Sequence, residues 1–204
     1  MKLHYSKTSP YVRKVMVVAT EKGLADRFEK IEGPVTPISV NDEVNQDNPL
    51  GKVPGLVTDD GMALFDSRVI CEYLDSIGSG PTLFPASGAA RWTALRRQAQ
   101  GDGLLDAALL ARYETAMRPA DKLWPEWRDG QKAKMARALD AFEAEADKLG
   151  DTLDIGTIAV ACALGYMDFR YDADGWRSTR PKLAAWFETF AKRPSMTSTE
   201  PPKG

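Results

Sequence analysis

The chain has 204 residues, of which 43% are hydrophobic and 27% are charged, an ordinary composition for a globular protein. Its formal net charge of −2 offers no basic footprint, so we expect no nucleic-acid partner. The two cysteines, Cys71 and Cys162, fit neither metal-ligand spacing nor a disulfide framework, and His4 is the single histidine. We therefore expect no metal site and no Ser–His–Asp hydrolase.

Nothing at the start of the sequence has the charged and apolar regions of a signal peptide. The longest apolar run, residues 155–167, is too short to span a bilayer and is expected to be a buried helix. We expect no membrane partner, and the unpaired cysteines favour a reducing, cytoplasmic location.

Strands and helices alternate in the first 77 residues, which predicts an α/β domain at residues 1–77. Asp60-Gly61 between two apolar runs is a strong hairpin signal. The patterns predict strands at residues 2–5, 28–31, 56–58 and 62–65, helices at residues 10–22 and 66–77, and mainly loop at residues 36–49.

A stretch rich in glycine, proline and serine, residues 78–88, predicts a linker. An all-helical domain is expected at residues 89–204, with a short polar tail from Pro194 that we expect to be loose. Its helices are predicted at residues 89–117, 131–149, 155–167 and 181–192.

The stretch "TSPYVRKV" places Ser9 just before Pro10, where serine is a good helix cap and proline a good first helical residue. Ser9 has a second possible role. A helix N-terminus carries partial positive charge, and a thiol brought there loses its proton more easily. The pattern thus allows either a simple cap or a hydroxyl that donates to a bound thiolate.

Two further motifs allow a structural and a functional interpretation. In "GKVP", Pro54 either marks a plain turn or is cis and leaves the Val53 backbone open to an extended peptide. In "FDSR", Asp66 or Ser67 either caps a helix or binds the ammonium and carboxylate of an amino-acid headgroup.

Together, "TSPYVRKV", "NPLGKVP" and "FDSRVICEYL" resemble, in order and spacing, the cytosolic glutathione transferases of the bacterial type. The resemblance covers nearly the whole chain. It implies a thioredoxin-like α/β N-terminal domain, an all-α helical C-terminal domain, glutathione as co-substrate and a homodimer.

The resemblance also implies roles for individual residues. Ser9 would be the catalytic residue near the glutathione sulfur, and Val53, beside a cis Pro54, would pair with the cysteinyl unit. Lys52 would meet the glycyl carboxylate. The γ-glutamyl end would be held by Asp66 and Ser67, supported by Arg68 and by Asp102, which would reach across a dimer interface; a solvated helix face is the alternative for these last two.

A pocket for the second substrate is expected between the domains, with Tyr11, Tyr113, Trp124 and Trp127 as candidate lining residues. Packing in the core or on the surface is the alternative for each of them. His4 is expected to be packed or solvent-facing, and both cysteines are expected to be small core residues.

Two features depart from the family pattern. No cysteine lies at or near Ser9, so glutaredoxin-like thiol chemistry is not expected. A helix in the C-terminal domain usually begins with Ser/Thr-x-x-Asp, whereas "DIGT" here places Asp154 at the cap and Thr157 three residues later. We expect that helix to form, with a weaker reciprocal bond from threonine.

The resemblance predicts a detoxifying glutathione transferase, whose thiolate attacks a small hydrophobic electrophile. One alternative is a non-catalytic module that binds glutathione or a protein partner. Another is a glutathione-dependent isomerase, dehalogenase or peroxidase, since these functions share the fold and the glutathione site.

Overall fold

The computed structural model describes residues 1–33 and 35–202, which form two compact units. One unit joins residues 1–86 to the segment that begins at Pro194, and the other contains residues 87–193. The first unit contains β1 (Lys2–Tyr5), α1 (Pro10–Glu21), η1 (Ala25–Arg27), β2 (Glu29–Glu32), α2 (Asp42–Asp47), β3 (Gly55–Val57), β4 (Ala63–Leu64), α3 (Ser67–Ile77) and α9 (Pro194–Thr197). The predicted strands and helices of the α/β domain are thus confirmed within a few residues.

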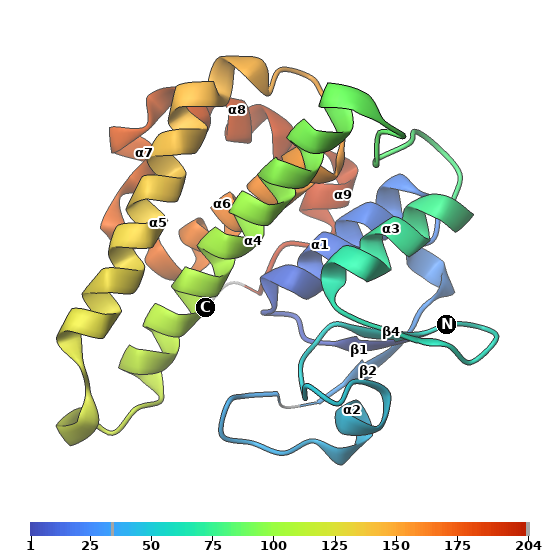
Figure 1. Ribbon diagram of the computed structural model, residues 1–204, viewed down its shortest axis with the longest axis horizontal. Coiled ribbons are helices and arrows are strands. Elements are labelled where there is room, and N and C mark those ends of the chain that lie inside the picture. The colour runs from blue at the N-terminus through green and yellow to red at the C-terminus, as the bar shows by residue number, and fades with distance from the viewer. Residues whose placement is uncertain (34, 203–204) are drawn as a thin grey trace. The chain divides into compact units, whose positions relative to one another are not determined.

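The first unit is built on a four-stranded mixed sheet in the order β2-β1-β3-β4. Strand β1 pairs parallel with β2 and antiparallel with β3, which pairs antiparallel with β4. Helices α1 and α3 lie side by side on one side of the sheet, and α2 lies on the other (Figure 1). This is the expected thioredoxin-like architecture. Leu3 and Leu56 in the sheet and Val15 in α1 are fully buried in its core.

Residues 194–197 of the expected loose tail form helix α9, which packs against α1, so that expectation is wrong. Ser195 and Met196 of α9 are buried. The Arg13 guanidinium donates to the Met196 carbonyl at 3.1 Å, and the Ser195 hydroxyl donates to Glu21 at 2.5 Å. These contacts attach α9 to α1 in the first unit, although the sequence assigned it to the helical domain. Domain boundaries at residues 77 and 89 remain a prediction.

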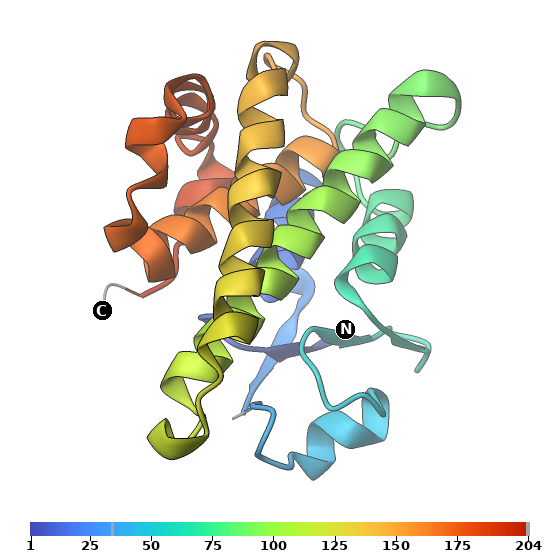
Figure 2. The ribbon, with the colours of Figure 1, turned by 60° about the vertical axis from the view of Figure 1, so that its left-hand side comes forward.

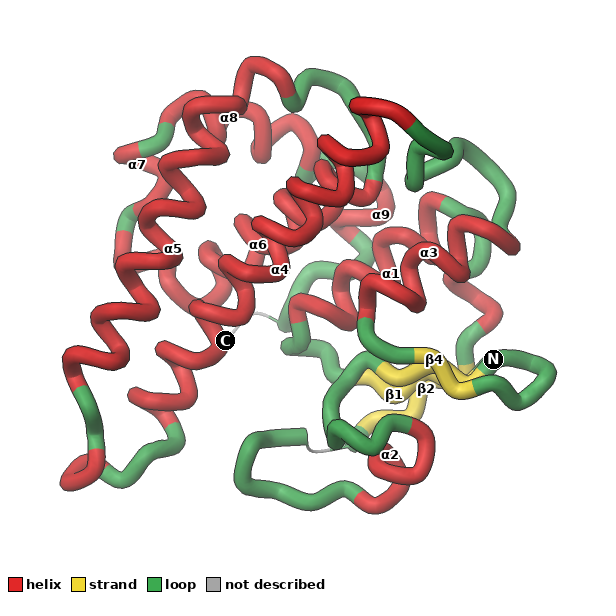
Figure 3. Tube along the Cα trace, in the orientation of Figure 1, coloured by secondary structure: helices red, strands yellow, loops and turns green. Residues whose placement is uncertain are grey.

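The second unit is entirely helical, as expected, and its helices are drawn in red in Figure 3. The long helix α4 packs against α5 and α6, as Figure 2 shows. The predicted helix at residues 131–149 begins earlier, at Pro125, because proline is well suited to the first helical turn. The bounds are α4 (Gly88–Ala116), η2 (Ala120–Lys122), α5 (Pro125–Glu145), η3 (Ala146–Lys148), α6 (Ile155–Tyr171), η4 (Asp172–Asp174), α7 (Trp176–Thr179) and α8 (Pro181–Phe190).

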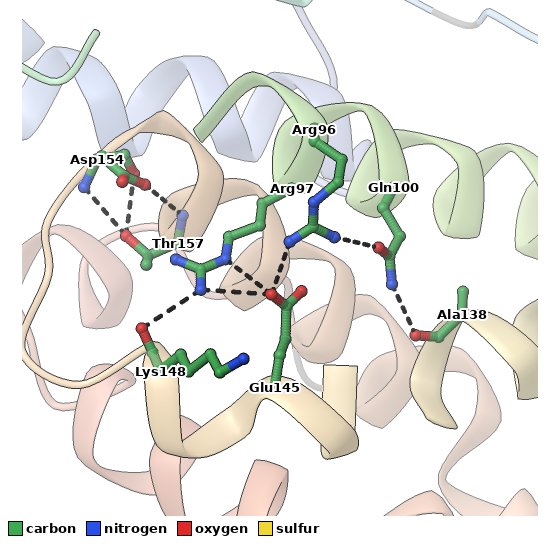
Figure 4. Close-up of polar contacts among 8 residues, drawn as sticks. All are labelled: Arg96, Arg97, Gln100, Ala138, Glu145, Lys148, Asp154 and Thr157. Atoms are coloured by element: carbon green, nitrogen blue, oxygen red, sulfur yellow. Dashed lines mark hydrogen bonds and ion pairs between the residues drawn. The ribbon is translucent and has the colours of Figure 1, made fainter. Parts of the chain in front are cut away.

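The start of α6 is fixed by a complete capping box, shown in Figure 4. The Thr157 N–H donates to the Asp154 carboxylate at 2.8 Å, and the Asp154 N–H donates to the Thr157 hydroxyl at 3.1 Å. Close by, Glu145 accepts from Arg96 at 2.6 Å and from Arg97 at 3.3 Å, which ties α4 to the end of α5. The prediction that this helix forms is confirmed.

Candidate functional site

Sheet topology brings the three sequence motifs of the first unit to one edge of the sheet. His4 near the end of β1 lies opposite Gly55 at the start of β3. Leu64 at the end of β4 lies opposite Leu56, the next residue of β3. The chain therefore leaves β1 toward Ser9, approaches β3 through the "GKVP" segment and leaves β4 toward Asp66, all at the same edge.

The first of these segments ends at Ser9, which is the N-cap of α1, with Pro10 as the first helical residue. Its hydroxyl oxygen accepts one long bond of 3.3 Å from the Val12 N–H. The side chain is partly exposed, and its hydroxyl proton is donated to no group in the described part of the chain. The cap interpretation is thus confirmed, and the hydroxyl keeps a proton that can be offered to a ligand.

The second segment is held by the buried side chain of Asn48. Its amide donates to the Lys52 carbonyl at 2.8 Å, and its oxygen accepts from the Leu50 N–H at 3.1 Å. The Val53–Pro54 bond is cis, as the resemblance implied. Within residues 1–33 and 35–202 the Val53 N–H and carbonyl have no hydrogen-bond partner, and Lys52 is exposed. The loop presents a backbone edge that an extended ligand can pair with.

A pair of residues that the sequence did not reveal supports this loop. His4 is fully buried, and its Nε2 lies 2.7 Å from the Asp47 carboxylate at the end of α2. Its Nδ1 is buried with no hydrogen-bond partner among the described residues. An Nε2–H group at this position can donate to the Asp47 carboxylate. The His4–Asp47 pair attaches α2 to strand β1. Asn48, which follows α2 directly, in turn holds the loop before Pro54.

The third segment is the start of α3. Asp66 is the N-cap, and its carboxylate accepts from the Arg68 N–H at 2.9 Å. The peptide bond between Phe65 and Asp66 is cis. Asp66 and Arg68 are exposed, while Ser67 is buried as the first helical residue. An exposed carboxylate thus sits directly beside the free N–H groups of a helix start, so one point offers partners for both an ammonium and a carboxylate.

The other predicted residues are divided between the two units. Tyr11 lies partly buried in α1 of the first unit. In the second unit, Asp102 is buried, which contradicts the alternative of a solvated helix face for this residue. Burial raises the pKa of Tyr113 in α4. Trp124 is 60% exposed, and its backbone N–H donates to the Glu114 carboxylate at 2.8 Å. Their grouping in one pocket remains a prediction, as it does for the partly buried Trp127.

Among the residues that the structure describes, no group of three or more histidine, cysteine, aspartate or glutamate side chains is placed to hold a metal ion. Within residues 1–33 and 35–202, no helix has both the length and the apolar character needed to cross a membrane. Cys71 and Cys162 are both buried, as predicted for small core residues.

The fold and the three motifs at one sheet edge agree with the comparisons to known proteins. The family model of the glutathione S-transferase N-terminal domain matches residues 8–77, and that of the C-terminal domain matches residues 125–189. The chain belongs to the glutathione S-transferase family.

Three comparisons show how far this similarity extends. The chain is 39% identical to the uncharacterized GST-like protein YibF of Escherichia coli K12, over the full length of both. A glutathione transferase family member from Pseudomonas fluorescens Pf-5, solved with bound glutathione, is 47% identical, with 99% of each chain covered and a TM-score of 0.96. A structure of a family member from the same organism with bound S-(propanoic acid)-glutathione is 45% identical, with 100% of each chain covered and a TM-score of 0.91.

Proposed function

We propose that the chain is a glutathione transferase with a serine at its active-site helix start. It would activate the thiol of glutathione for attack on a small hydrophobic electrophile. The observation that carries this proposal is the open helix start at Ser9, which shares one sheet edge with the Val53 backbone and the α3 start. The two Pseudomonas fluorescens structures, with bound glutathione and with bound S-(propanoic acid)-glutathione, support it.

The residues present fit glutathione segment by segment. The Val53 N–H and carbonyl can pair with the cysteinyl unit as an added strand would. Asp66 can bind the γ-glutamyl ammonium, while Ser67 and the α3 N-terminus can bind its carboxylate. The exposed ammonium of Lys52 can meet the glycyl carboxylate.

Catalysis would begin with loss of the thiol proton to solvent. The Ser9 hydroxyl and the α1 N-terminus would stabilise the resulting thiolate, with serine as donor and never as nucleophile. A free thiol has a pKa of about 8.5, and each unit of depression needs about 1.4 kcal/mol. One charge-assisted hydrogen bond supplies about that amount. The thiolate sulfur then forms a bond to the electrophilic carbon, whose bonding pair leaves with a departing group or shifts to a neighbouring atom.

Several finer proposals rest on the resemblance alone. We propose that Arg68 and Asp102 support the γ-glutamyl grip, that the protein is a cytoplasmic homodimer and that its role is detoxification. Sedimentation of the purified protein tests the proposed dimer. The measured mass should be twice that of the 22.4 kDa chain.

The proposal is tested by titrating glutathione into the purified chain in a calorimeter and then assaying conjugation with an activated aryl halide. We expect saturable binding, and turnover above the uncatalysed rate. Binding without turnover for a panel of electrophiles would favour the non-catalytic module or one of the other glutathione-dependent reactions. Absence of binding would contradict the proposal.

A further inference from the structure

Helix α9 lies beside α1, the helix that begins after Ser9 (Figure 1). Two long side chains of α1 reach α9, one from the first turn of α1 and one from its last residue. The Arg13 guanidinium donates to the Met196 carbonyl at 3.1 Å, and Glu21 accepts from the Ser195 hydroxyl at 2.5 Å. The side chain of Met196 is fully buried, so the carbonyl that Arg13 contacts belongs to a residue held in the core.

Arg13 also completes the first turn of α1. Its backbone N–H donates to the Ser9 carbonyl at 3.0 Å, while the Val12 N–H donates to the Ser9 hydroxyl oxygen at 3.3 Å. Two bonds thus hold Ser9 on the helix, and the residue that makes the shorter one is itself attached to α9. A continuous set of hydrogen bonds leads from Ser9 through Arg13 to Met196.

The position of Arg13 is unfavourable for the helix by itself. A cation in the first turn opposes the positive end of the helix dipole, and the first turn of α1 contains no acidic residue to offset it. Within residues 1–33 and 35–202, the Arg13 guanidinium forms no ion pair, and its Nε is buried with no hydrogen-bond partner. Local helix stability therefore does not account for this arginine, whereas its contact with α9 does.

We propose that Arg13 is a positioning residue for Ser9, with the Met196 carbonyl of α9 as its anchor. Helix ends fray, because their terminal residues lack part of the intrahelical hydrogen bonds. The bond to Met196 restrains the first turn of α1, so the Ser9 hydroxyl and the free N–H groups beside it keep one orientation toward the sulfur. This inference rests on the proposed glutathione transferase function and adds a residue to that same site.

The anchor acts on thiolate formation rather than on glutathione binding. The contacts proposed for the γ-glutamyl and cysteinyl units lie on other segments of the sheet edge, at the start of α3 and at Val53. Loss of the Arg13 bond therefore weakens the stabilisation of the thiolate and leaves most binding contacts in place. The turnover number falls while the dissociation constant of glutathione stays nearly constant, as for an interaction that matters mainly after binding.

Three substitutions in the full chain test the anchor. Arg13→Met removes the donor and keeps an unbranched side chain, Arg13→Lys keeps a cation that can donate to the carbonyl, and Met196→Ala keeps Arg13 but weakens the packing of α9. We expect Arg13→Met and Met196→Ala to raise the pKa of the bound thiol by about half a unit and to lower turnover about threefold. Glutathione affinity should stay within about twofold of wild type. Arg13→Lys should restore most of the turnover. Thiolate absorbance against pH, steady-state kinetics and calorimetry measure the three quantities.

Ser195→Ala is the matched control, because it removes the bond between α9 and Glu21 at the other end of α1. It should lower the stability measured by urea unfolding and leave the thiol pKa and turnover as in wild type. A shift in Ser195→Ala as large as that in Arg13→Met would show general loosening of the unit and overturn the proposal. A shift in Arg13→Met without one in Met196→Ala would assign the effect to charge alone and overturn it too.

The remaining outcomes separate this proposal from the proposed function. If Arg13→Met fails to fold, Met196→Ala and Ser195→Ala still decide. Wild type that binds glutathione with a lowered thiol pKa, alongside variants that match it, overturns the role of Arg13 alone. A bound thiol with the pKa of free glutathione in wild type overturns the roles of both Arg13 and Ser9. A chain that does not bind glutathione overturns the proposed function as well.

Discussion

Helices α1 and α6 begin with the same kind of side-chain cap, yet the two helix starts differ in what they leave free. At α6, Asp154 and Thr157 exchange bonds of 2.8 and 3.1 Å in the buried interior. At α1, the partly exposed Ser9 accepts a single bond of 3.3 Å from Val12 and retains its hydroxyl proton.

The difference shows that a cap motif by itself does not identify a binding site. Both helix starts have an acceptor side chain before the helix. At the start of α6, the polar groups of Asp154 and Thr157 pair with each other. The one at α1 keeps a donor and a positive helix end at an edge where two other motifs converge. We therefore assign a structural role to Asp154 and propose a functional role for Ser9.

The largest expected effect on stability comes from the start of α6, where the capping groups are paired with each other. Asp154→Ala leaves the Thr157 N–H buried without its acceptor, so the free energy of unfolding should fall by about 2 kcal/mol. Urea unfolding measures it. Because Asp154 plays no part in the glutathione site, the affinity for glutathione should stay unchanged in the folded variant. A large loss of affinity would show that this helix start is also functional.

The start of α1 should show the opposite pattern, in which a substitution changes function more than stability. Ser9→Ala should lower the turnover number roughly tenfold, because one charge-assisted bond to the thiolate is lost. The dissociation constant for glutathione should change little, since most contacts are made elsewhere. Steady-state kinetics and calorimetry separate the two quantities. Wild-type turnover in this variant would indicate that Ser9, like Asp154, is only a structural cap.

A third helix start, at α3, is proposed to combine both roles, and its charge can be removed while its cap is kept. Asp66→Asn retains a good N-cap but loses the partner of the γ-glutamyl ammonium. We expect glutathione to bind about fivefold more weakly with little change in stability. Calorimetry and urea unfolding measure both, and an unchanged dissociation constant would count against the headgroup assignment.

The smallest effect on stability and on glutathione affinity is expected at the His4–Asp47 pair, which supports the loop before Pro54. Asp47→Asn keeps the acceptor for His4 but makes the bond neutral, which should lower the free energy of unfolding by about 0.5–1 kcal/mol. Glutathione affinity should fall no more than about twofold, because Asn48 still holds Lys52. A larger loss would show that the pair directly sets the position of Val53.

What the sequence predicted follows from how local each signal is. Ser9-Pro10, Asp66-Ser67 and Asp154 mark helix starts because a cap and its target lie within three residues of one another. His4 and Asp47 could not be paired in advance, since they are far apart in the chain and only the fold makes them neighbours.

The tail was mispredicted for a related physical reason. Residues after Pro194 are mostly polar, which favours a loose segment, but Met196 supplies one apolar side chain that is fully buried, in a helix that packs against α1. Arg13 then donates to its carbonyl. A single anchor residue gives no periodicity, so composition alone pointed to the wrong state.

The most direct test of the account is the pKa of the glutathione thiol when it is bound to the chain. Thiolate absorbance would be followed against pH for saturated wild type and for Ser9→Ala. We predict that wild type forms the thiolate at least one unit below the free value of about 8.5, and that Ser9→Ala moves it back toward that value. Equal thiolate pKa values in both proteins would contradict the claim that the open helix start at Ser9 activates the sulfur.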